Sequence, residues 1–294
     1  MNLKIYAIVV TYNGSKWIDK CFGSLVNSTT PVKIIAIDNA SSDGTPDIIK
    51  EKFPQVEVIE TGHNLGFGKA NNIGLKRVLE ENADYAFLLN QDAWVEEDTI
   101  EKLVDVQQKN PEFGILSPVP YDGTEKEFDR QFKLYYSKPH DINNIRDDDK
   151  INKVSFINAA GWLVSNNTIK KTGLFHHLFF QRGEDVDYAN RCHYHNINIG
   201  FHNSSKYYHD RQNVWHKNIS HPKRIQSTQS KLNITLNNIN KSPGTRVKMF
   251  FCQIKTLHSS KQLTLTDTLR ILIRYIFKGP YILLKSNKLK QPYC

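Results

Sequence analysis

Three polar segments follow apolar, strand-like runs in the first third of the chain. They are Thr11-Tyr12-Asn13, Asp38-Asn39 and Asn90-Gln91-Asp92. A carboxylate just past a buried strand, such as Asp38, can accept a hydrogen bond from a nucleobase ring N–H. Asp92 stands among oxygen ligands of the kind that hold Mg²⁺ or Mn²⁺, with diphosphate oxygens completing the shell. The alternative for both is a simple turn, or for the Asp38 segment a helix cap, because Asp, Asn, Ser and Gly form turns.

A glycine-rich loop follows at residues 62–74 and contains Asn64, Gly66 and Lys69. Glycines let a backbone approach a phosphate, and a helix N-terminus attracts anions. The spacing of the glycines is not the GxGxxG pattern of dinucleotide-binding proteins. The loop therefore indicates an anion site only weakly.

Two late segments carry possible proton-transfer or metal chemistry. Glu184-Asp185 opens a predicted helix, where an acid in a cleft could serve as a general base or merely complement the helix dipole. Asp187 has the i,i+4 spacing for an ion pair with Arg191, which favours a structural role. His209 follows a strand-like run, and a lone histidine is also commonly a satisfied core or surface residue.

Alternating apolar blocks predict the elements that must position these residues. We expect strands at 6–12, 33–38, 56–59, 85–89 and 115–119, and helices at 45–53, 69–79 and 96–108. Thr45-Pro46 has the pattern of an N-cap followed by proline in the first helical turn. Strands alternating with helices predict an α/β fold with a mostly parallel sheet. In such sheets ligands bind beyond the carboxyl ends of the strands, where the three polar segments stand.

The second half of the chain is less regular in pattern. Residues 121–153 are polar and predict a mobile excursion over the sheet. We expect a strand over 154–165 with Gly161 in its middle, a helix over 184–195 and extended chain over 199–208. The composition changes near residue 221, so we expect domains at 1–220 and 221–294.

Seven motifs in this order make the sequence recognisable. They are IVVTYNG (8–14), IDNASSDGT (37–45), HNLGFGKANNIG (63–74), LLNQD (88–92), NAAGWLVS (158–165), the 173–191 segment containing FFQRGEDVDYANR, and His209. The set resembles family 2 glycosyltransferases of the GT-A fold, especially the rhamnosyltransferase-like branch of bacterial surface-polysaccharide synthesis. The resemblance covers about residues 3–212.

The resemblance implies an inverting transferase that uses a nucleotide-diphosphate sugar and Mg²⁺ or Mn²⁺. By position, it implies that Asp38 reads the pyrimidine edge, that Asp92 binds the metal, that Asp185 in the Glu184-Asp185 pair is the general base, and that His209 contacts the metal. The nucleotide, ribose and diphosphate would be lined by Thr11, Tyr12, Asn13, Asn39, Asn64, Gly66, Lys69, Asn90 and Gln91. The implied acceptor is a glycan or lipid-linked hydroxyl, and the implied sugar is rhamnose from a thymidine donor.

Two departures from the family pattern leave alternatives open. Asn90 replaces the first acid of the family's Asp-x-Asp motif, and Asp210-Arg211 follow His209 in place of small residues. The alternatives are a non-catalytic nucleotide-sugar or polysaccharide-binding protein on the same fold, and a nucleotidyltransferase. The latter would normally show a basic, glycine-rich loop after the first strand.

Charge is concentrated at the end of the chain. The 294 residues carry a formal net charge of +9, and residues 246–294 hold ten Lys/Arg against one acid. The rest balances, so we expect no nucleic-acid partner. Arg270, Arg274 and Lys278 recur along one side of an apolar segment that Gly279-Pro280 is expected to end. This pattern predicts binding to an anionic membrane surface, or else packing on the catalytic domain.

Four scattered cysteines show no metal or redox spacing, which predicts a reducing compartment. The N-terminus has no signal-peptide pattern, and no apolar run reaches membrane-spanning length. We therefore expect a cytoplasmic protein, peripheral on the inner face of a bacterial plasma membrane.

Overall fold

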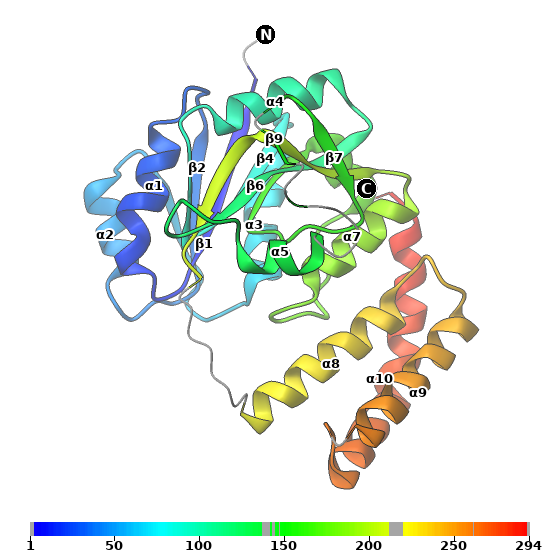
Figure 1. Ribbon diagram of the computed structural model, residues 1–294. Coiled ribbons are helices and arrows are strands. Elements are labelled where there is room, and N and C mark those ends of the chain that lie inside the picture. Colours follow the sequence, from blue (N-terminus) through cyan, green and yellow to red (C-terminus); the bar gives the residue numbers. More distant parts are fainter. Residues whose placement is uncertain are drawn as a thin grey trace.

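A mixed β-sheet forms the centre of the fold in the computed structural model (Figure 1), which describes residues 3–136, 142, 145–146, 148–211, 220–260 and 262–292. The strand order is β3-β2-β1-β4-β8-β6-β9-β5, and β7 pairs with β9. The strands are β1 (Ile5–Thr11), β2 (Lys33–Asp38), β3 (Glu57–Glu60), β4 (Tyr85–Asn90), β5 (Ala93–Val95), β6 (Phe113–Asp122), β7 (Ile151–Val154), β8 (Gly161–Ser165) and β9 (Asn198–His209).

Helices cover both faces of the sheet and then continue beyond it. The short 3-10 helices are η1 (Ser15–Trp17) and η3 (Asn287–Lys290). The α-helices are α1 (Ile18–Val26), α2 (Thr45–Lys52), α3 (Phe67–Glu80), α4 (Thr99–Lys109), α5 (Arg130–Tyr136), α6 (Asn166–Thr172), α7 (Glu184–Tyr194), α8 (His221–Asn237), α9 (Pro243–Ser259) and α10 (Leu265–Ser286).

The parallel half of the sheet confirms the predicted α/β fold. Strands β3, β2, β1 and β4 run in the same direction. Their register pairs Thr11 with Asp38 and Val10 with Asn90, so these strands end at one edge. The first three polar segments therefore emerge side by side, as the sequence predicts.

The antiparallel half brings distant segments to the same edge. Strand β8 runs antiparallel between β4 and β6, and Gly161 at its start pairs with Leu89. Strand β9 runs parallel to β6, and β5 pairs antiparallel with β9 so that Ala93 lies opposite His209. The end of β9 thus reaches the segment that follows β4.

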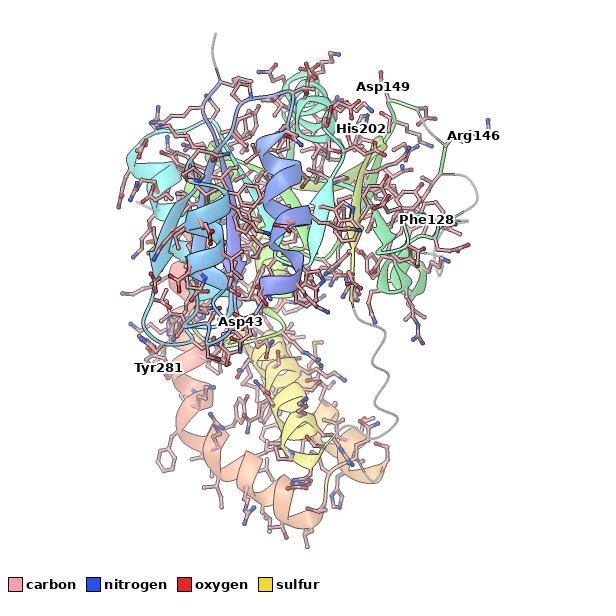
Figure 2. The ribbon with its side chains drawn as sticks, turned by 90° about the vertical axis from the view of Figure 1, so that its left-hand side faces the viewer. Asp43, Phe128, Arg146, Asp149, His202 and Tyr281 are labelled. Carbon is pink, nitrogen blue, oxygen red and sulfur yellow. The ribbon has the colours of Figure 1, made fainter. Side chains whose placement is uncertain are left out.

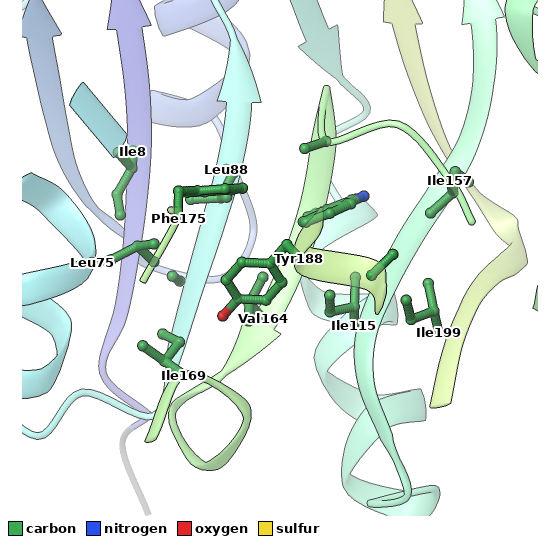
Figure 3. Close-up of a cluster of buried hydrophobic side chains, with 14 of the residues drawn as sticks. Ile8, Leu75, Leu88, Ile115, Ile157, Val164, Ile169, Phe175, Tyr188 and Ile199 are labelled. Carbon is green, nitrogen blue, oxygen red and sulfur yellow. The ribbon is translucent and has the colours of Figure 1, made fainter. Parts of the chain in front are cut away.

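Side-chain alternation along the strands divides the core between the two faces of the sheet. Ile8 and Leu88 pack with α3, α6 and α7 on one face, where Figure 3 shows Tyr188 beside Phe175. Ala7 and Phe87, their neighbours in sequence, pack with α1, α2 and α4 on the other face. This period of two is the physical signature of a sheet covered on both sides.

Helices α8, α9 and α10 pack around a third apolar cluster of their own. They lie together beside the α/β body in both views (Figures 1 and 2). Two side-chain contacts attach α8 to the body: Asn237 Nδ2 donates to Asp187 Oδ1 at 2.5 Å, and Ser230 Oγ donates to the Arg182 carbonyl at 2.5 Å. The division into domains at 1–220 and 221–294 stays a prediction. Among the described residues, no helix has the length and apolarity needed to cross a bilayer.

Several element boundaries differ from the sequence prediction. The expected strand at 154–165 is two strands, because residues 155–160 form a loop and Gly161 begins β8. The three-residue β5 was not predicted, and it exists because β9 supplies its hydrogen-bond partners. The 121–153 region contains α5 and the start of β7, although residues 137–141, 143–144 and 147 of it lie outside the described part.

Gly279-Pro280 does not end the last helix, contrary to the prediction. Helix α10 runs through Pro280 to Ser286. A proline costs one backbone hydrogen bond and crowds the preceding turn. Here Pro280 faces solvent, a Thr264–Asp267 capping box fixes the helix start, and the buried face on both sides of Pro280 packs on the neighbouring helices. That packing outweighs the cost of the proline.

Candidate active site

The loop between β2 and α2 is folded around the Asp38 carboxylate. Asp38 is 1% exposed, and its Oδ1 accepts the Thr11 hydroxyl at 2.8 Å while its Oδ2 accepts the Ser41 backbone N–H at 2.8 Å. The Ser41 hydroxyl also donates to Oδ1. Asp38 therefore ties the ends of β1 and β2 together.

The helix that follows this loop is not capped as predicted. Gly44, with φ of +80°, is the N-cap of α2, and Thr45 is already inside the helix. The Thr45 hydroxyl instead donates to Asp43, which also accepts the Ser15 backbone N–H at 3.0 Å. Although burial opposes the change, these hydrogen bonds lower the pKa of Asp43 to about 2. Asp43 thus replaces Thr45 as the residue that organises the helix start.

Tyr12 and Asn13 lie where β1 turns into η1. The side-chain amide of Gln91 forms two hydrogen bonds with the Tyr12 backbone: Oε1 accepts the Tyr12 N–H at 2.8 Å, and Nε2 donates to the Tyr12 carbonyl at 3.1 Å. Asn13 has φ of +49°, donates its backbone N–H to Ser41 Oγ at 2.9 Å and accepts the Ser42 N–H at 2.8 Å. The Tyr12 side chain remains 47% exposed and can present its ring to a ligand.

The glycine-rich loop lies next to this edge and begins α3. Asn64 Oδ1 accepts the Gly66 N–H at 2.9 Å, and Asn39 Oδ1 accepts the Leu65 N–H at 3.2 Å. Gly66 has φ of +81°, and a Cβ built on it would lie 2.0 Å from the carbonyl oxygen of Phe180. Only glycine suits this position. Lys69, in the first turn of α3, is exposed.

Asp92 and His209 meet across the β4 and β9 ends. His209 Nε2 lies 3.2 Å from Asp92 Oδ1 and 3.4 Å from Asn90 Nδ2. The Asp92 side chain is 24% exposed, whereas His209 is buried. Asn90 Oδ1 and His209 Nδ1 are buried and have no hydrogen-bond partner among the described residues. No group of three or more His, Cys, Asp or Glu among the described residues forms a complete metal site.

A pocket of about 590 Å³, which the sequence did not reveal, has His209 in its lining. Trp17 and Trp94 line it, but a lysine ammonium lies 4.0 Å from the centroid of each ring. Each indole N–H donates to a carboxylate, that of Trp17 to Asp210 at 2.9 Å. Lys16 covers one face of the Trp17 ring, and Lys20 covers one face of the Trp94 ring. The two indoles therefore stabilise the loops around His209.

Glu184 and Asp185 form the first turn of α7. Asp185 Oδ1 accepts the Val186 N–H at 2.8 Å, and Asn158 Nδ2 lies 3.5 Å from Oδ2. Burial raises the pKa of Asp185. Burial, together with the charge of Asp185, raises the pKa of Glu184 to about 7. Within the part of the chain that the structure describes, Glu184 Oε2 has no hydrogen-bond partner. A buried carboxylate with a raised pKa is suited to take up a proton.

The segment 158–160 connects this acid pair to the strand edge. Asn158 contacts Asp185, while the Ala160 carbonyl accepts the Asn90 N–H at 3.0 Å. On the other side, a Cβ built on Gly68 would lie 3.5 Å from Glu184 Cβ. The start of α7 therefore lies against the start of α3. Asn158 has no role assigned by the sequence, because an amide in an apolar motif carries no chemical signal until its partner is known.

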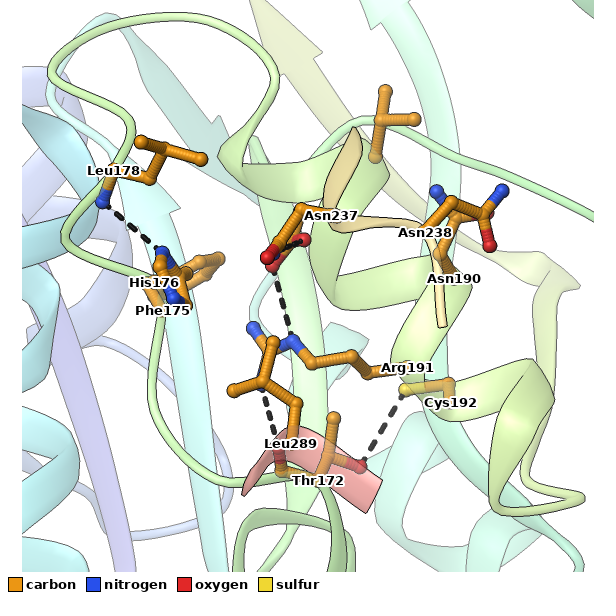
Figure 4. Close-up of polar contacts among 12 residues, drawn as sticks. Thr172, Phe175, His176, Leu178, Asn190, Arg191, Cys192, Asn237, Asn238 and Leu289 are labelled. Carbon is orange, nitrogen blue, oxygen red and sulfur yellow. Dashed lines mark hydrogen bonds and ion pairs between the residues drawn. The ribbon is translucent and has the colours of Figure 1, made fainter. Parts of the chain in front are cut away.

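Asp187 has the structural role that its spacing predicts. It forms a buried ion pair with Arg191 at 3.0 Å, and Arg191 also donates to the Thr172 carbonyl at 2.5 Å. Figure 4 shows Arg191 between Thr172 and Asn237 of α8. Asp187 therefore has a structural role that differs from the role of Asp185: it holds α7 and α8 together.

A sequence model of glycosyl transferase family 2 matches residues 6–172, more than half of the chain and most of the edge just described. The chain belongs to glycosyl transferase family 2. It is therefore a sugar-transferring enzyme, which confirms the prediction from the seven motifs.

Curated relatives of this family 2 glycosyltransferase include two rhamnosyltransferases. It is 26% identical over 210 residues to the N-acetylglucosaminyl-diphospho-decaprenol L-rhamnosyltransferase of Mycobacterium tuberculosis, covering 63% of this chain and 68% of that protein. It is 24% identical over 194 residues to the dTDP-rhamnosyl transferase RfbF of Shigella flexneri, covering 65% of this chain and 64% of that protein.

Solved structures share the fold. The TarS fragment 1–349 of S. aureus in complex with UDP has a TM-score of 0.60 and 14% identity, covering 97% of this chain and 89% of that one. The mannosyltransferase PcManGT of Pyrobaculum calidifontis in complex with GDP-Man and Mn²⁺ has a TM-score of 0.61 and 13% identity, covering 98% and 85%. These matches confirm the predicted GT-A fold.

Proposed function

We propose that this enzyme transfers rhamnose from a dTDP-linked donor to a hydroxyl of a lipid-linked glycan acceptor, with inversion at the sugar. The observation that carries the proposal is the shared sheet edge. The Asp38 loop, the Asp92–His209 pair and the Glu184–Asp185 pair lie around it, joined through the 158–160 segment. The names of the two rhamnosyltransferase relatives supply the sugar, and one of them supplies the lipid-linked acceptor.

The residues at the end of β4 fit a divalent cation. Asp92 offers a partly exposed carboxylate, and His209 offers an imidazole. Asn90 Oδ1 is a buried oxygen that no described residue contacts by a hydrogen bond. Two or three protein ligands suffice where the substrate diphosphate completes the shell, as is usual for Mg²⁺. A bound Mg²⁺ or Mn²⁺ would neutralise charge that develops on the leaving diphosphate. The Mn²⁺ in the PcManGT structure supports this use of the fold.

The donor is held by the other residues of the edge. The exposed ring of Tyr12 and the Asp38 loop form the side on which the base would lie, with Asn13, Asn39 and Gln91 fixing the loop backbones. In this arrangement the N-terminus of α3 and the exposed Lys69 face the diphosphate, because a helix N-terminus attracts anions. Asp38 would read the pyrimidine edge through the remaining lone pair of Oδ2, because its other lone pairs are taken by Thr11 and Ser41.

Asp185 acts as the general base in the proposed mechanism. The acceptor oxygen bonds to C1 of the sugar as the bond from C1 to the diphosphate oxygen breaks, and the electron pair leaves with the diphosphate. The acceptor proton goes to Asp185, whose raised pKa increases its affinity for a proton. Burial, together with the neighbouring charge of Asp185, raises the pKa of Glu184 to about 7, so this second acid lies beside the proposed base with an increased affinity for a proton.

A lipid-linked acceptor places the enzyme at a membrane. We propose the cytoplasmic position predicted from the sequence, peripheral on the inner face of the plasma membrane. The basic C-terminal segment supports this position.

A donor panel tests the proposed function. Purified enzyme is given dTDP-rhamnose, UDP-GlcNAc or GDP-mannose with Mn²⁺ and a polyprenyl-diphosphate-GlcNAc acceptor, and release of the nucleoside diphosphate is measured. We expect the dTDP donor to be preferred and EDTA to abolish turnover. Asp92→Ala should weaken both donor binding and turnover, whereas the exposed Asp105→Ala on α4 should change neither. Equal turnover in EDTA would contradict the metal assignment, and preference for another donor would contradict the sugar.

A further inference from the structure

One face of α10 exposes an unusual number of large apolar side chains. Seven of them are between 49% and 79% exposed. We call this set the apolar face of α10; it consists of Leu265, Leu269, Ile273, Ile276, Phe277, Tyr281 and Leu284. Scattered exposed apolar residues need no explanation, but a contiguous patch marks an interaction site.

The patch belongs to a well-packed helix. On the opposite side of α10, Ile271, Tyr275 and Ile282 are buried against the neighbouring helices, and the Tyr275 hydroxyl donates to Asn233 Oδ1 at 2.6 Å. The helix continues through Pro280, so the apolar face runs along α10 from Leu265 to Leu284, about 30 Å at 1.5 Å per residue. A helix with its inner face already satisfied has an outer face free for a second partner.

Charge next to the apolar face indicates which partner. Arg270, Arg274 and Lys278 follow one another at four-residue spacing along its border, and Lys285 continues the line two turns later. The single acid of the segment, Asp267, is held in the capping box and lies 3.0 Å from His221. An apolar stripe bordered by cations is complementary to a bilayer with anionic headgroups.

We propose that the apolar face of α10 inserts in the plane of an anionic lipid bilayer, with its bordering cations on the headgroups. A second copy of the chain is a poorer occupant, because symmetric pairing would oppose the like charges of the two borders. Figures 1 and 2 show α8–α10 projecting from the body, and Figure 2 places Asp43, next to the candidate site, at the edge from which they project. Insertion would hold the site near the bilayer, a consequence that rests on the proposed lipid-linked acceptor.

Vesicle binding by the full chain tests the insertion. Flotation is measured with vesicles of pure phosphatidylcholine and with vesicles containing 30% phosphatidylglycerol. Wild-type protein should bind the anionic vesicles. The triple variant Leu269→Gln, Ile276→Gln and Phe277→Gln should bind at least tenfold more weakly, and glutamine is a good helix former, so α10 should persist. A matched control, Leu134→Gln with Val26→Gln, replaces exposed apolar residues elsewhere and should bind like wild type.

Charge is tested in the same way. A triple variant replaces by glutamine two border cations, Arg270 and Lys285, and the exposed Lys288 of η3, which directly follows α10. This variant should bind the anionic vesicles tenfold or more weakly, because each cation near such a surface contributes about 1 kcal/mol. The control Lys109→Gln, Lys126→Gln and Lys171→Gln removes the same charge from exposed sites on the body and should have little effect.

Three results would overturn the proposal. They are the absence of wild-type binding to anionic vesicles, equal binding by the apolar-face variant and wild type, and a wild-type dimer that this variant converts to a monomer without loss of vesicle binding. Thermal unfolding of each variant confirms its folding. Donor hydrolysis is measured separately in detergent solution, where no bilayer is needed. This assay tests the proposed function and the vesicle assay tests the insertion, so either proposal can fail without the other.

Discussion

Replacement of Asp185 by asparagine separates proton transfer from donor binding. The substitution keeps the shape of the side chain, so Oδ1 can still accept the Val186 N–H. The new amide would face Asn158 Nδ2. Asn158 Oδ1 has no partner among the residues that the structure describes, so a flip of the Asn158 amide restores a hydrogen bond. Removal of a buried carboxylate also relieves its desolvation cost. We expect Asp185→Asn to be folded and at least as stable as wild type at pH 8.

The expected effect on turnover is large. Loss of a general base reduces kcat by about 10²–10⁴, equivalent to about 3–5 kcal/mol of transition-state stabilisation. Asp185 contacts the 158–160 segment and not the β1 or β2 loops, so the dissociation constant for the donor should change less than threefold. The effect should therefore appear in kcat and not in donor affinity.

The assay combines calorimetric donor binding with initial rates of diphosphate release. Glu184→Gln is the matched control, since it removes the adjacent acid, and we expect it to retain more than a tenth of wild-type kcat. If Asp185→Asn turns over normally while Glu184→Gln is inactive, Glu184 is the base and the assignment is reversed. If both variants are fully active, neither acid accepts the acceptor proton.

Three further predictions concern stability and donor binding. Burial raises the folded-state pKa of Glu184 from 4.5 to about 7, so the stability that its protonated form contributes is complete below pH 4.5 and is lost as the pH rises through 7. Between pH 5 and 8.5 the free energy of unfolding in urea should therefore fall by about 2–3 kcal/mol more for wild type than for Glu184→Gln. Equal falls for the two proteins would refute this prediction. Gly66→Ala should raise the KM for the donor at least tenfold, because its new Cβ would clash with the carbonyl of Phe180. Gly62→Ala should raise the KM less, because a Cβ built there lies within 4 Å of no described atom. Equal KM values for the two variants would count against the loop assignment. Arg191→Met strands a buried carboxylate and should cost about 3–5 kcal/mol in urea unfolding, a value that a loss below about 1 kcal/mol would contradict.

Regular local patterns made much of the fold predictable. β1, β2 and β4 are runs of buried residues that end in polar ones, so their positions follow from the sequence to within a residue. The Asp187–Arg191 ion pair follows from helical spacing alone. These features depend on neighbours in sequence, which is why sequence reasoning finds them.

The remaining features depend on partners far along the chain. β5 is a strand because β9, more than a hundred residues later, pairs with it. The partnership of Asn158 with Asp185 requires the β8 and α7 positions together. Pro280 is accepted in α10 because of packing on α8 and α9 that no local pattern reports. The motif resemblance supplied what spacing could not, namely that Asp92 and His209 lie close together, and the structure places them 3.2 Å apart.

We propose that the donor diphosphate binds between the end of β4 and the start of α3, where Asp92 would hold the cation that neutralises it. A crystal structure of the enzyme with dTDP and Mn²⁺ tests it most directly, using the anomalous signal of manganese to locate the ion. We predict one manganese peak coordinated by Asp92 and by both phosphates, with the thymine beside Asp38 and the Asp185 carboxylate facing the β-phosphate. A nucleotide bound elsewhere, or manganese bound without contact to Asp92, would contradict the account.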